Sequence, residues 1–311
     1  MNSFTMKVFA GNANPALAKE ICGCLNVGLG KAYVRSFSDG EIYLQIQENV
    51  RGADVFVVQS TTTNEFLLEL LIIVDALRRA SAERITAVVP YFGYARQDRK
   101  HQGRVPITAK LVANLLTTAG IGRLVTVDLH AQQIQGFFDI PVDHLLALPV
   151  QIGYLEQLDL RNPMVVSPDT GSTKIADALA RRLRLPLAII DKRRTGDSSV
   201  EAVSLIGEVR GHDVILIDDM ITTAGSICAA ITVARQHDAQ RVVPVCSHAV
   251  LCGNAFERLR DSGIHELVVT DTIPLKRRFA ELPITVLSIA GLLGKAIERI
   301  HTNQSVSALF V

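Results

Sequence analysis

The sequence predicts an α/β protein with two doubly wound domains, each built around a parallel sheet. Three observations support this fold class. Apolar runs of strand length alternate with helix-like segments along all 311 residues, which is typical of parallel sheets covered by helices on both faces. The run 214–217 contains only Val, Ile and Leu, as expected for a strand buried on both faces. A single sheet holding all the predicted strands would be unusually wide, so two domains are expected.

The individual elements follow from periodicity. Residues 65–80 carry Leu68, Leu71, Ile72 and Leu77 at helical spacing. The predicted strands are residues 54–59, 85–89, 124–128, 164–167, 187–191, 214–218, 241–246 and 267–270. The predicted helices are residues 65–80, 108–119, 173–184, 226–236, 254–261 and 289–300. Residues 36–42 are predicted to form a turn between two strands. We expect domains at residues 1–148 and 149–288, with residues 289–311 packing back on the first.

Composition excludes several functions. The formal net charge is +1, which argues against broad electrostatic binding to nucleic acid. No apolar run approaches the roughly 18 residues of a membrane span. Residues 1–14 lack a basic segment followed by a long apolar stretch, so no signal peptide is visible and the cytoplasm is the expected compartment. The chain has five cysteines, and Cys22 and Cys24 have no further metal ligands nearby in the sequence.

Two adjacent acids and a turn of small residues follow the run 214–217. Asp218 and Asp219 stand at the carboxyl end of the predicted strand, where open α/β sheets bind ligands. The turn comprises Thr222, Thr223, Ala224, Gly225 and Ser226. Its backbone N–H groups and hydroxyls, at the start of a helix, can form an anion site. An anion site beside paired acids suits a phosphorylated sugar. The alternative is a capped helix that follows two surface acids.

Two long segments without regular periodicity, residues 91–105 and 192–204, are rich in Arg and Lys. Long connections in compact domains are usually functional. Residues 90–100 place aromatic rings beside clustered cations, which suits stacking on a base and neutralising a polyphosphate. Lys192, Arg193 and Arg194 follow a predicted strand and repel one another unless anions lie near. For both segments the alternative is a solvated run of charge.

Polar residues also end two further predicted strands. Asp128 and His130 stand at the end of the strand at 124–128, and Asp169 follows the strand at 164–167. A lone histidine is more often structural than a ligand.

These motifs resemble a known family. Residues 214–226 are similar to the phosphoribosyl-pyrophosphate motif of type I phosphoribosyltransferases. Together with residues 69–77, 90–100, 106–116 and 126–138, they resemble the class I ribose-phosphate pyrophosphokinases, and the resemblance extends from Phe37 to Phe310. It implies two domains of type I phosphoribosyltransferase-like topology. It also implies transfer of the pyrophosphoryl group of magnesium–ATP to the 1-hydroxyl of ribose 5-phosphate, giving AMP and 5-phosphoribosyl 1-pyrophosphate.

The resemblance assigns roles to individual residues. Lys192 and Arg194 would stabilise charge on the transferring group, on a mobile lid. ATP would be bound by Arg96, Gln97 and Arg99, and by Phe37, Asp39, Gly40 and Glu41 of a neighbouring subunit. Ribose 5-phosphate would be bound by Arg194, Asp218, Asp219, Thr222, Thr223, Ala224, Gly225 and Ser226. His130 and Asp169 would help to hold Mg²⁺. The resemblance further implies a homohexamer built from dimers with shared active sites, and neither nucleic acid nor a membrane is an expected partner.

Several positions depart from the family pattern. Thr222 stands where the family usually has Asp, and Thr170-Gly171-Ser172 stands where it usually has a Gly-Gly pair. Gly103 and Asn49 occupy positions of the phosphate and ADP effector site, so an altered effector response is expected. These departures leave two alternatives open, a non-catalytic regulatory homologue of the synthetase and a phosphoribosyltransferase that acts on a base.

Overall fold

The protein is described by a computed structural model that covers residues 4–194 and 201–309. The chain divides into two compact units. The first unit comprises Met1–Leu146, Thr272–Pro274 and Ser288–Val311, and the second comprises Ala147–Asp271 and Leu275–Leu287. In the described ranges, no helix combines the length and the apolar character needed to cross a membrane.

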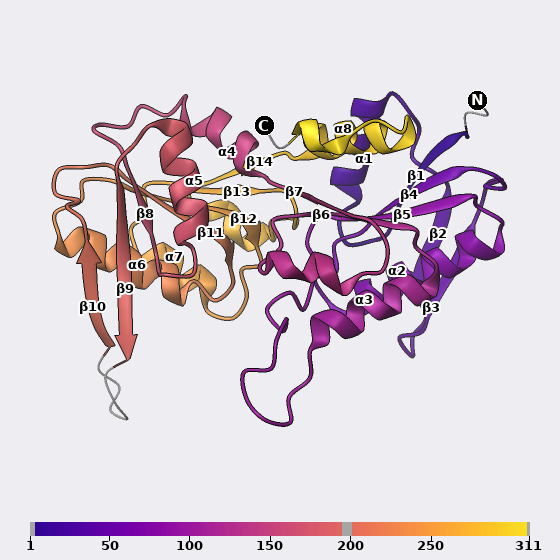
Figure 1. Ribbon diagram of the computed structural model, residues 1–311, viewed down its shortest axis with the longest axis horizontal. Coiled ribbons are helices and arrows are strands. Elements are labelled where there is room, and N and C mark those ends of the chain that lie inside the picture. The colour runs from indigo at the N-terminus through magenta and orange to yellow at the C-terminus, as the bar shows by residue number, and fades with distance from the viewer. Residues whose placement is uncertain (1–3, 195–200, 310–311) are drawn as a thin grey trace. The chain divides into compact units, whose positions relative to one another are not determined.

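The first unit is built on a five-stranded parallel sheet in the order β1-β4-β5-β6-β7. The strands are β1 (Met6–Ala10), β4 (Asp54–Val58), β5 (Arg84–Val89), β6 (Arg123–Val127) and β7 (Val142–Leu145). One face of this sheet is covered by α2 (Asn64–Arg79) and α3 (Thr108–Ala119), and the other by α1 (Pro15–Leu25) and α8 (Ala290–His301) (Figure 1). All five residues of β4 are buried, because helices cover both faces.

Three smaller elements complete the first unit. A hairpin of β2 (Ala32–Ser36) and β3 (Ile42–Ile46) is antiparallel, with Ser36 paired to Ile42. The turn predicted between two strands at residues 36–42 is therefore confirmed. Two 3₁₀ helices follow later in the chain, η1 (Gln132–Phe137) and η3 (Val306–Leu309).

The second unit contains a seven-stranded sheet in the order β10-β9-β8-β11-β12-β13-β14. Its strands are β8 (Met164–Ser167), β9 (Leu187–Arg194), β10 (Glu201–Ile206), β11 (Val214–Ile221), β12 (Val242–Ala249), β13 (Leu267–Thr270) and β14 (Ile284–Leu287). All neighbours are parallel except β9 and β10. Its helices are α4 (Leu148–Leu155), α5 (Thr173–Leu183), α6 (Gly225–Gln236), α7 (Ala255–Asp261) and η2 (Arg277–Glu281).

The strand order of the second unit reverses between β8 and β11. From β8 the chain continues to β9 on one side, and it returns to β11 on the other side. Such a switch point opens a crevice at the carboxyl ends of the two strands. Pairing between β8 and β11 ends at Val166 and Leu216, whereas β11 stays paired with β12 as far as Ile221 and Ala249. The last residues of β11 are therefore unpaired on the β8 side.

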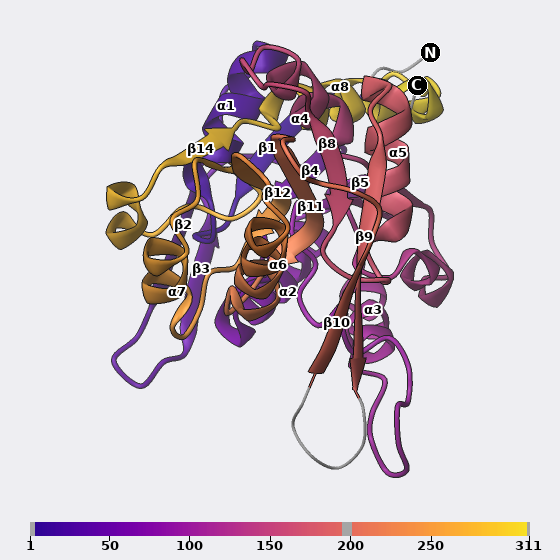
Figure 2. The same cartoon turned by 90° about the vertical axis from the view of Figure 1, so that its left-hand side faces the viewer.

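The structure confirms the α/β class with parallel sheets and corrects one segment. The stretch 192–204 was predicted to be irregular, but β9 continues to Arg194 and pairs with β10, which begins at Glu201 (Figure 2). Residues 195–200 of the predicted lid lie outside the described ranges. The charged residues 191–194 hid the end of β9, because an apolar run is the signal that marks a strand.

Candidate active site

Three acids stand around the switch point of the second unit. Asp218 and Asp219 lie in the part of β11 beyond its pairing with β8, and Asp169 follows β8. All three are half-buried. Asp169 Oδ1 accepts hydrogen bonds from the N–H groups of Gly171 at 2.9 Å and Ser172 at 3.1 Å. The structure therefore brings together acids that the sequence could assign only to separate strand ends.

The carboxyl group of Asp218 is held by two donors. Asp218 Oδ1 accepts from Ser172 Oγ at 2.7 Å and from Asp219 N at 2.9 Å. Burial, followed by the negative charge of Asp219, raises the pKa of Asp218 to about 7. A carboxyl group that titrates near neutral pH in a crevice is a candidate functional group.

The turn that follows β11 has the geometry of an anion site. Ala224 adopts a left-handed conformation with φ of 59°, and α6 begins at the next residue with no capping hydrogen bond from a side chain of the described ranges. The first N–H groups of a helix have no partner within the helix, so they are suited to an anion. Thr223 and Ser226 are exposed, and Thr222 and Gly225 are half-buried.

A cation from α7 supports this turn. Arg258 Nη1 donates to the Thr223 carbonyl oxygen at 2.9 Å, and a Cβ at Gly225 would lie 3.2 Å from the same nitrogen. A second bond holds the turn from the other side, since Cys252 N donates to the Thr222 carbonyl oxygen at 2.9 Å. Sequence reasoning did not identify Arg258, because a single basic residue on a helix carries no motif.

The loop after β5 carries the predicted ATP residues of the first unit. Arg96, Gln97 and Arg99 are exposed. Gly93 N donates to Thr61 Oγ1 at 2.7 Å. A Cβ at Gly93 would lie 2.1 Å from the Thr61 carbonyl oxygen, so only glycine fits this close approach of the two backbones. The loop is therefore anchored to the segment that follows β4.

The segment after β6 lies beside the same loop. Gln133 Nε2 donates to Asp98 Oδ2 at 2.6 Å, which joins the cationic loop to the residues that follow His130. Asp128, at the end of β6, has a positive φ of 39°. A positive φ is strained for a residue other than glycine, and such residues gather at functional sites. His130 is exposed. The structure therefore assembles the cationic loop and the His130 segment at the carboxyl edge of this sheet.

The predicted adenine-binding residues lie at the tip of the β2–β3 hairpin. Phe37 is 43% exposed, and the Arg35 guanidinium carbon lies 5.0 Å from the centre of its ring. Glu41 N donates to Asp39 Oδ1 at 3.0 Å. Gly40 has a φ of 92°, which only glycine adopts readily. The tip thus presents an aromatic ring and two carboxylates to solvent.

The carboxylate oxygens of Asp169 are suited to binding magnesium. Its Oδ1 atom accepts from backbone N–H groups, and within the described ranges no hydrogen bond engages Oδ2. Magnesium in enzymes is commonly held by one or two carboxylates together with water and substrate phosphates. A closed protein cage is therefore not required, and within residues 4–194 and 201–309 no group of three or more His, Cys, Asp or Glu side chains is arranged to hold a metal.

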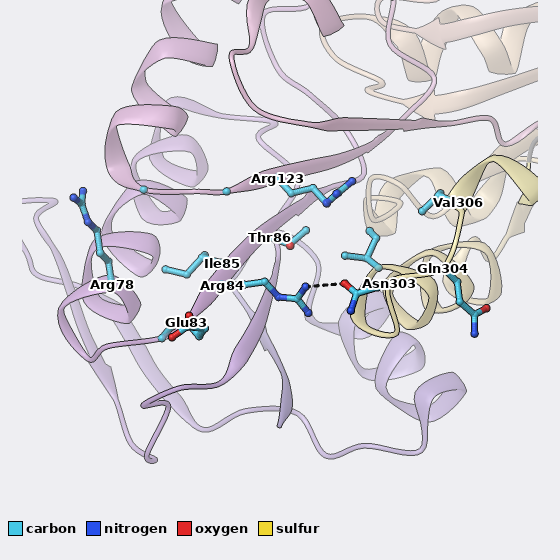
Figure 3. Close-up of a pocket in the computed structure, with 13 residues that line it drawn as sticks. Arg78, Glu83, Arg84, Ile85, Thr86, Arg123, Asn303, Gln304 and Val306 are labelled. Carbon is cyan, nitrogen blue, oxygen red and sulfur yellow. Dashed lines mark hydrogen bonds between the residues drawn. The ribbon is translucent and has the colours of Figure 1, made fainter. Parts of the chain in front are cut away.

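A cavity of about 560 Å³ lies at the opposite, amino-terminal edge of the sheet of the first unit (Figure 3). It is lined by Arg84 and Arg123, the first residues of β5 and β6. Arg84 forms an ion pair with buried Asp54 and donates to Asn303 Oδ1 at 3.2 Å, and Arg123 lies 2.6 Å from Asp143. These carboxylates balance the cations, so we assign the cavity no part in binding a nucleotide.

Together, these features define a doubly wound α/β protein with a candidate phosphate-ester site at a switch point. Comparison with known proteins specifies the class further. Residues 6–120 match the family described as the N-terminal domain of ribose phosphate pyrophosphokinase, and residues 198–311 match the phosphoribosyl synthetase-associated domain. The chain belongs to the ribose-phosphate pyrophosphokinase family, and the resemblance seen in its sequence is confirmed.

Individual relatives match over nearly the full length. The chain is 53% identical to the ribose-phosphate pyrophosphokinase of Burkholderia pseudomallei over 309 residues, which are 98% of this chain and 97% of the relative. It is 54% identical to that of Rhizobium meliloti over 309 residues, covering 98% of this chain and all of the relative. The crystal structure of phosphoribosylpyrophosphate synthetase from Mycobacterium smegmatis is similar with a TM-score of 0.90 and 43% identity, over 96% of this chain and 99% of that one.

Proposed function

We propose that the protein is a ribose-phosphate diphosphokinase. It transfers the pyrophosphoryl group of ATP to the 1-hydroxyl of ribose 5-phosphate and releases AMP. The observation that carries this proposal is the match to a phosphoribosylpyrophosphate synthetase structure at 43% identity over 96% of the chain. The acids and the uncapped helix start of the second unit support it, because they suit the hydroxyls and the phosphate of a sugar ester.

Each unit contributes a different part of the reaction. Arg96, Gln97 and Arg99 of the first unit bind ATP, with Phe37, Asp39, Gly40 and Glu41 supplied by a neighbouring subunit. The residues that bind ribose 5-phosphate are Asp218, Asp219, Thr222, Thr223, Ala224, Gly225, Ser226 and Arg194. The sugar oxygen attacks the β-phosphorus, and the bond from that phosphorus to the oxygen bridging to the α-phosphate breaks. Such a transfer depends on alignment and charge stabilisation, so no protein nucleophile is required.

Cations complete the arrangement. Lys192 and Arg194 stabilise the charge that develops on the transferring group. Asp169 would hold Mg²⁺ directly, and His130 would act through water or phosphate, because a nitrogen is a poor magnesium ligand. Mg²⁺ held there would neutralise part of the charge on the phosphates. The exposed aromatic tip of the hairpin favours an assembly with shared sites, which by resemblance is a homohexamer built from dimers.

The direct test follows AMP formation from ATP and ribose 5-phosphate by purified protein, with magnesium, inorganic phosphate and ADP titrated. We expect AMP and 5-phosphoribosyl 1-pyrophosphate in equal amounts, and neither when one substrate is omitted. We also expect an altered phosphate and ADP response, because Gly103 and Asn49 replace effector-site residues. No AMP under any condition would refute the proposal. It would favour the alternative of a non-catalytic regulatory homologue, which the departures at Thr222 and Ser172 suggest.

Binding of ribose 5-phosphate should weaken as the pH falls through 7. The pKa of Asp218 is about 7, so its carboxylate accepts from sugar hydroxyls above that pH and gains a proton below it. Affinity should fall roughly tenfold between pH 8 and pH 6, since about one carboxyl in ten remains ionised at the lower value. Calorimetric titration without ATP measures this change.

The matched control is Asp218→Asn, which keeps the shape of the side chain and removes its titration. Only the smaller change from the sugar phosphate, whose second pKa is near 6, should then remain. A wild-type protein whose affinity changes no more than that of the variant would show that Asp218 does not act as the titrating acceptor.

A further inference from the structure

Ser172 joins the two strands that border the crevice of the second unit. It is the residue immediately before α5, and it is only 9% exposed. Its hydroxyl lies 2.7 Å from Asp218 Oδ1 and 3.3 Å from Asp169 Oδ1. Because the pairing of β8 with β11 has already ended at Val166 and Leu216, this hydroxyl spans the two strands where the backbone ladder no longer does.

The Ser172 hydroxyl has one proton, so it can donate to only one of the two carboxylates. A serine hydroxyl donates one hydrogen bond. Asp169 Oδ1 already accepts from two backbone N–H groups, Gly171 and Ser172. The contact of the hydroxyl with Asp218 Oδ1 is shorter than its contact with Asp169 Oδ1, at 2.7 Å against 3.3 Å. The hydroxyl therefore donates its hydrogen bond to Asp218. Ser172 therefore uses its backbone to hold Asp169 and its side chain to hold Asp218.

This arrangement fixes the orientation of the Asp218 carboxyl group. Its Oδ1 atom receives Ser172 Oγ from one side and Asp219 N from the other. Two donors on one oxygen limit rotation of the carboxyl plane, and the bond between a hydroxyl and a carboxylate is stronger than one between neutral groups. Without the hydroxyl, Asp218 Oδ1 would lose the shorter of these two bonds and keep the one from Asp219 N.

We propose that Ser172 is a positioning residue of the ribose 5-phosphate site, which acts by orienting the Asp218 carboxyl group toward the sugar hydroxyls. This inference rests on the proposed function, since it refines how that site binds the sugar. Sequence reasoning noticed only that Ser172 interrupts the usual glycine pair. Nothing in the sequence of the turn 170–173 indicates a contact with β11, because Asp218 lies 46 positions after Ser172 in the chain.

The test compares variants that lack the hydroxyl, Ser172→Ala and Ser172→Gly, with Ser172→Thr, which keeps it. The loss of a hydrogen bond to a charged group should raise the KM for ribose 5-phosphate about tenfold. The KM for ATP should stay within about twofold, because the hydroxyl donates to Asp218 and the backbone N–H that holds Asp169 is kept in all three variants. The dissociation constant of ribose 5-phosphate, measured by calorimetry without ATP, should rise by the same factor. Ser172→Thr should restore most of the lost affinity.

The matched control is Thr173→Ala. Thr173 Oγ1 donates to the Thr170 carbonyl oxygen at 3.0 Å within the same turn and contacts neither acid. Its loss should leave both KM values within about twofold, as for a surface hydrogen bond of little net value. Unchanged sugar affinity in Ser172→Ala, an equal rise of both KM values, or an effect of Thr173→Ala as large as that of Ser172→Ala would each overturn the positioning role.

These outcomes separate the inference from the function on which it rests. AMP formation by the wild-type protein with unchanged sugar affinity in Ser172→Ala would remove the role of Ser172 and leave the proposed function intact. No AMP from the wild-type protein would refute the proposed function. The calorimetric comparison of Ser172→Ala with wild type would then still decide whether the hydroxyl supports sugar binding.

Discussion

Replacing Lys192 with alanine should lower kcat by about 10³-fold and change the dissociation constant of ribose 5-phosphate by less than about threefold. The loss is large because pyrophosphoryl transfer is promoted mainly by cations that stabilise developing charge, and removing one such group commonly costs 10²-fold or more. The measurement is single-turnover AMP formation at saturating substrates, alongside calorimetric titration of the sugar.

The control variant is Arg193→Ala. The family resemblance assigns roles to Lys192 and Arg194 but none to Arg193, so Arg193→Ala removes one charge of the same run without removing a proposed catalytic group. Arg193→Ala should keep kcat within about threefold, whereas Arg194→Ala should weaken both kcat and sugar binding. Equal losses in Arg193→Ala and Lys192→Ala would point to a general charge effect and contradict a catalytic role for Lys192.

Replacing Asp213 with alanine should lower the free energy of unfolding of the second unit by about 2–3 kcal/mol, because a buried carboxylate that accepts several hydrogen bonds is lost while its partner Arg241 stays partly exposed to water. Asp213 is buried at the start of β11. Its Oδ2 atom accepts from Arg241 Nε at 2.9 Å and from Arg161 N at 2.6 Å, and Oδ1 accepts from Arg241 N at 3.2 Å. The alanine variant would leave all these donors without their acceptor.

Urea unfolding followed by circular dichroism measures this loss. Asp177→Ala is the control, because the Asp177–Arg181 pair at 2.9 Å is exposed and should contribute less than about 0.5 kcal/mol. Asp213 lies at the amino end of β11, away from the acids of the crevice, so the Asp213→Ala protein that remains folded should retain wild-type kcat. An equal effect of the two substitutions on stability would contradict this account.

The same pair has a defined pH dependence. Burial opposes ionisation of Asp213, but hydrogen bonds from Arg241 and from the backbone of Arg161 outweigh it and lower its pKa. A lowered folded-state pKa gives stability that is present above the unfolded value, near 3.9, and is lost as the pH falls through the folded value. The stability difference between wild type and Asp213→Ala should therefore shrink in acid.

Much of the fold could be predicted because its signals are local. Helix α3 (Thr108–Ala119) and strands β8 and β13 have the bounds that periodicity indicates. Strand β7 was not predicted, since Asp143 and His144 interrupt its apolar residues, and β14 was missed although Ile284, Val286 and Leu287 are apolar. The hairpin of β9 and β10 was missed because β9 ends in the charged residues 191–194 and β10 begins with Glu201. Which two strands pair is also not encoded in the pattern of either strand alone.

For the candidate site, the sequence by itself determined which segments carry the chemistry. An apolar strand, two acids and a turn of small residues are adjacent between positions 214 and 226, so their physical meaning is complete within one segment. Only the tertiary structure decided which segments meet. Sheet order makes β8 and β11 neighbours and leaves the end of β11 open toward Asp169. The contact of Ser172 with Asp218 follows from that order, because strand neighbours are chosen by packing across the whole sheet and not by adjacent residues.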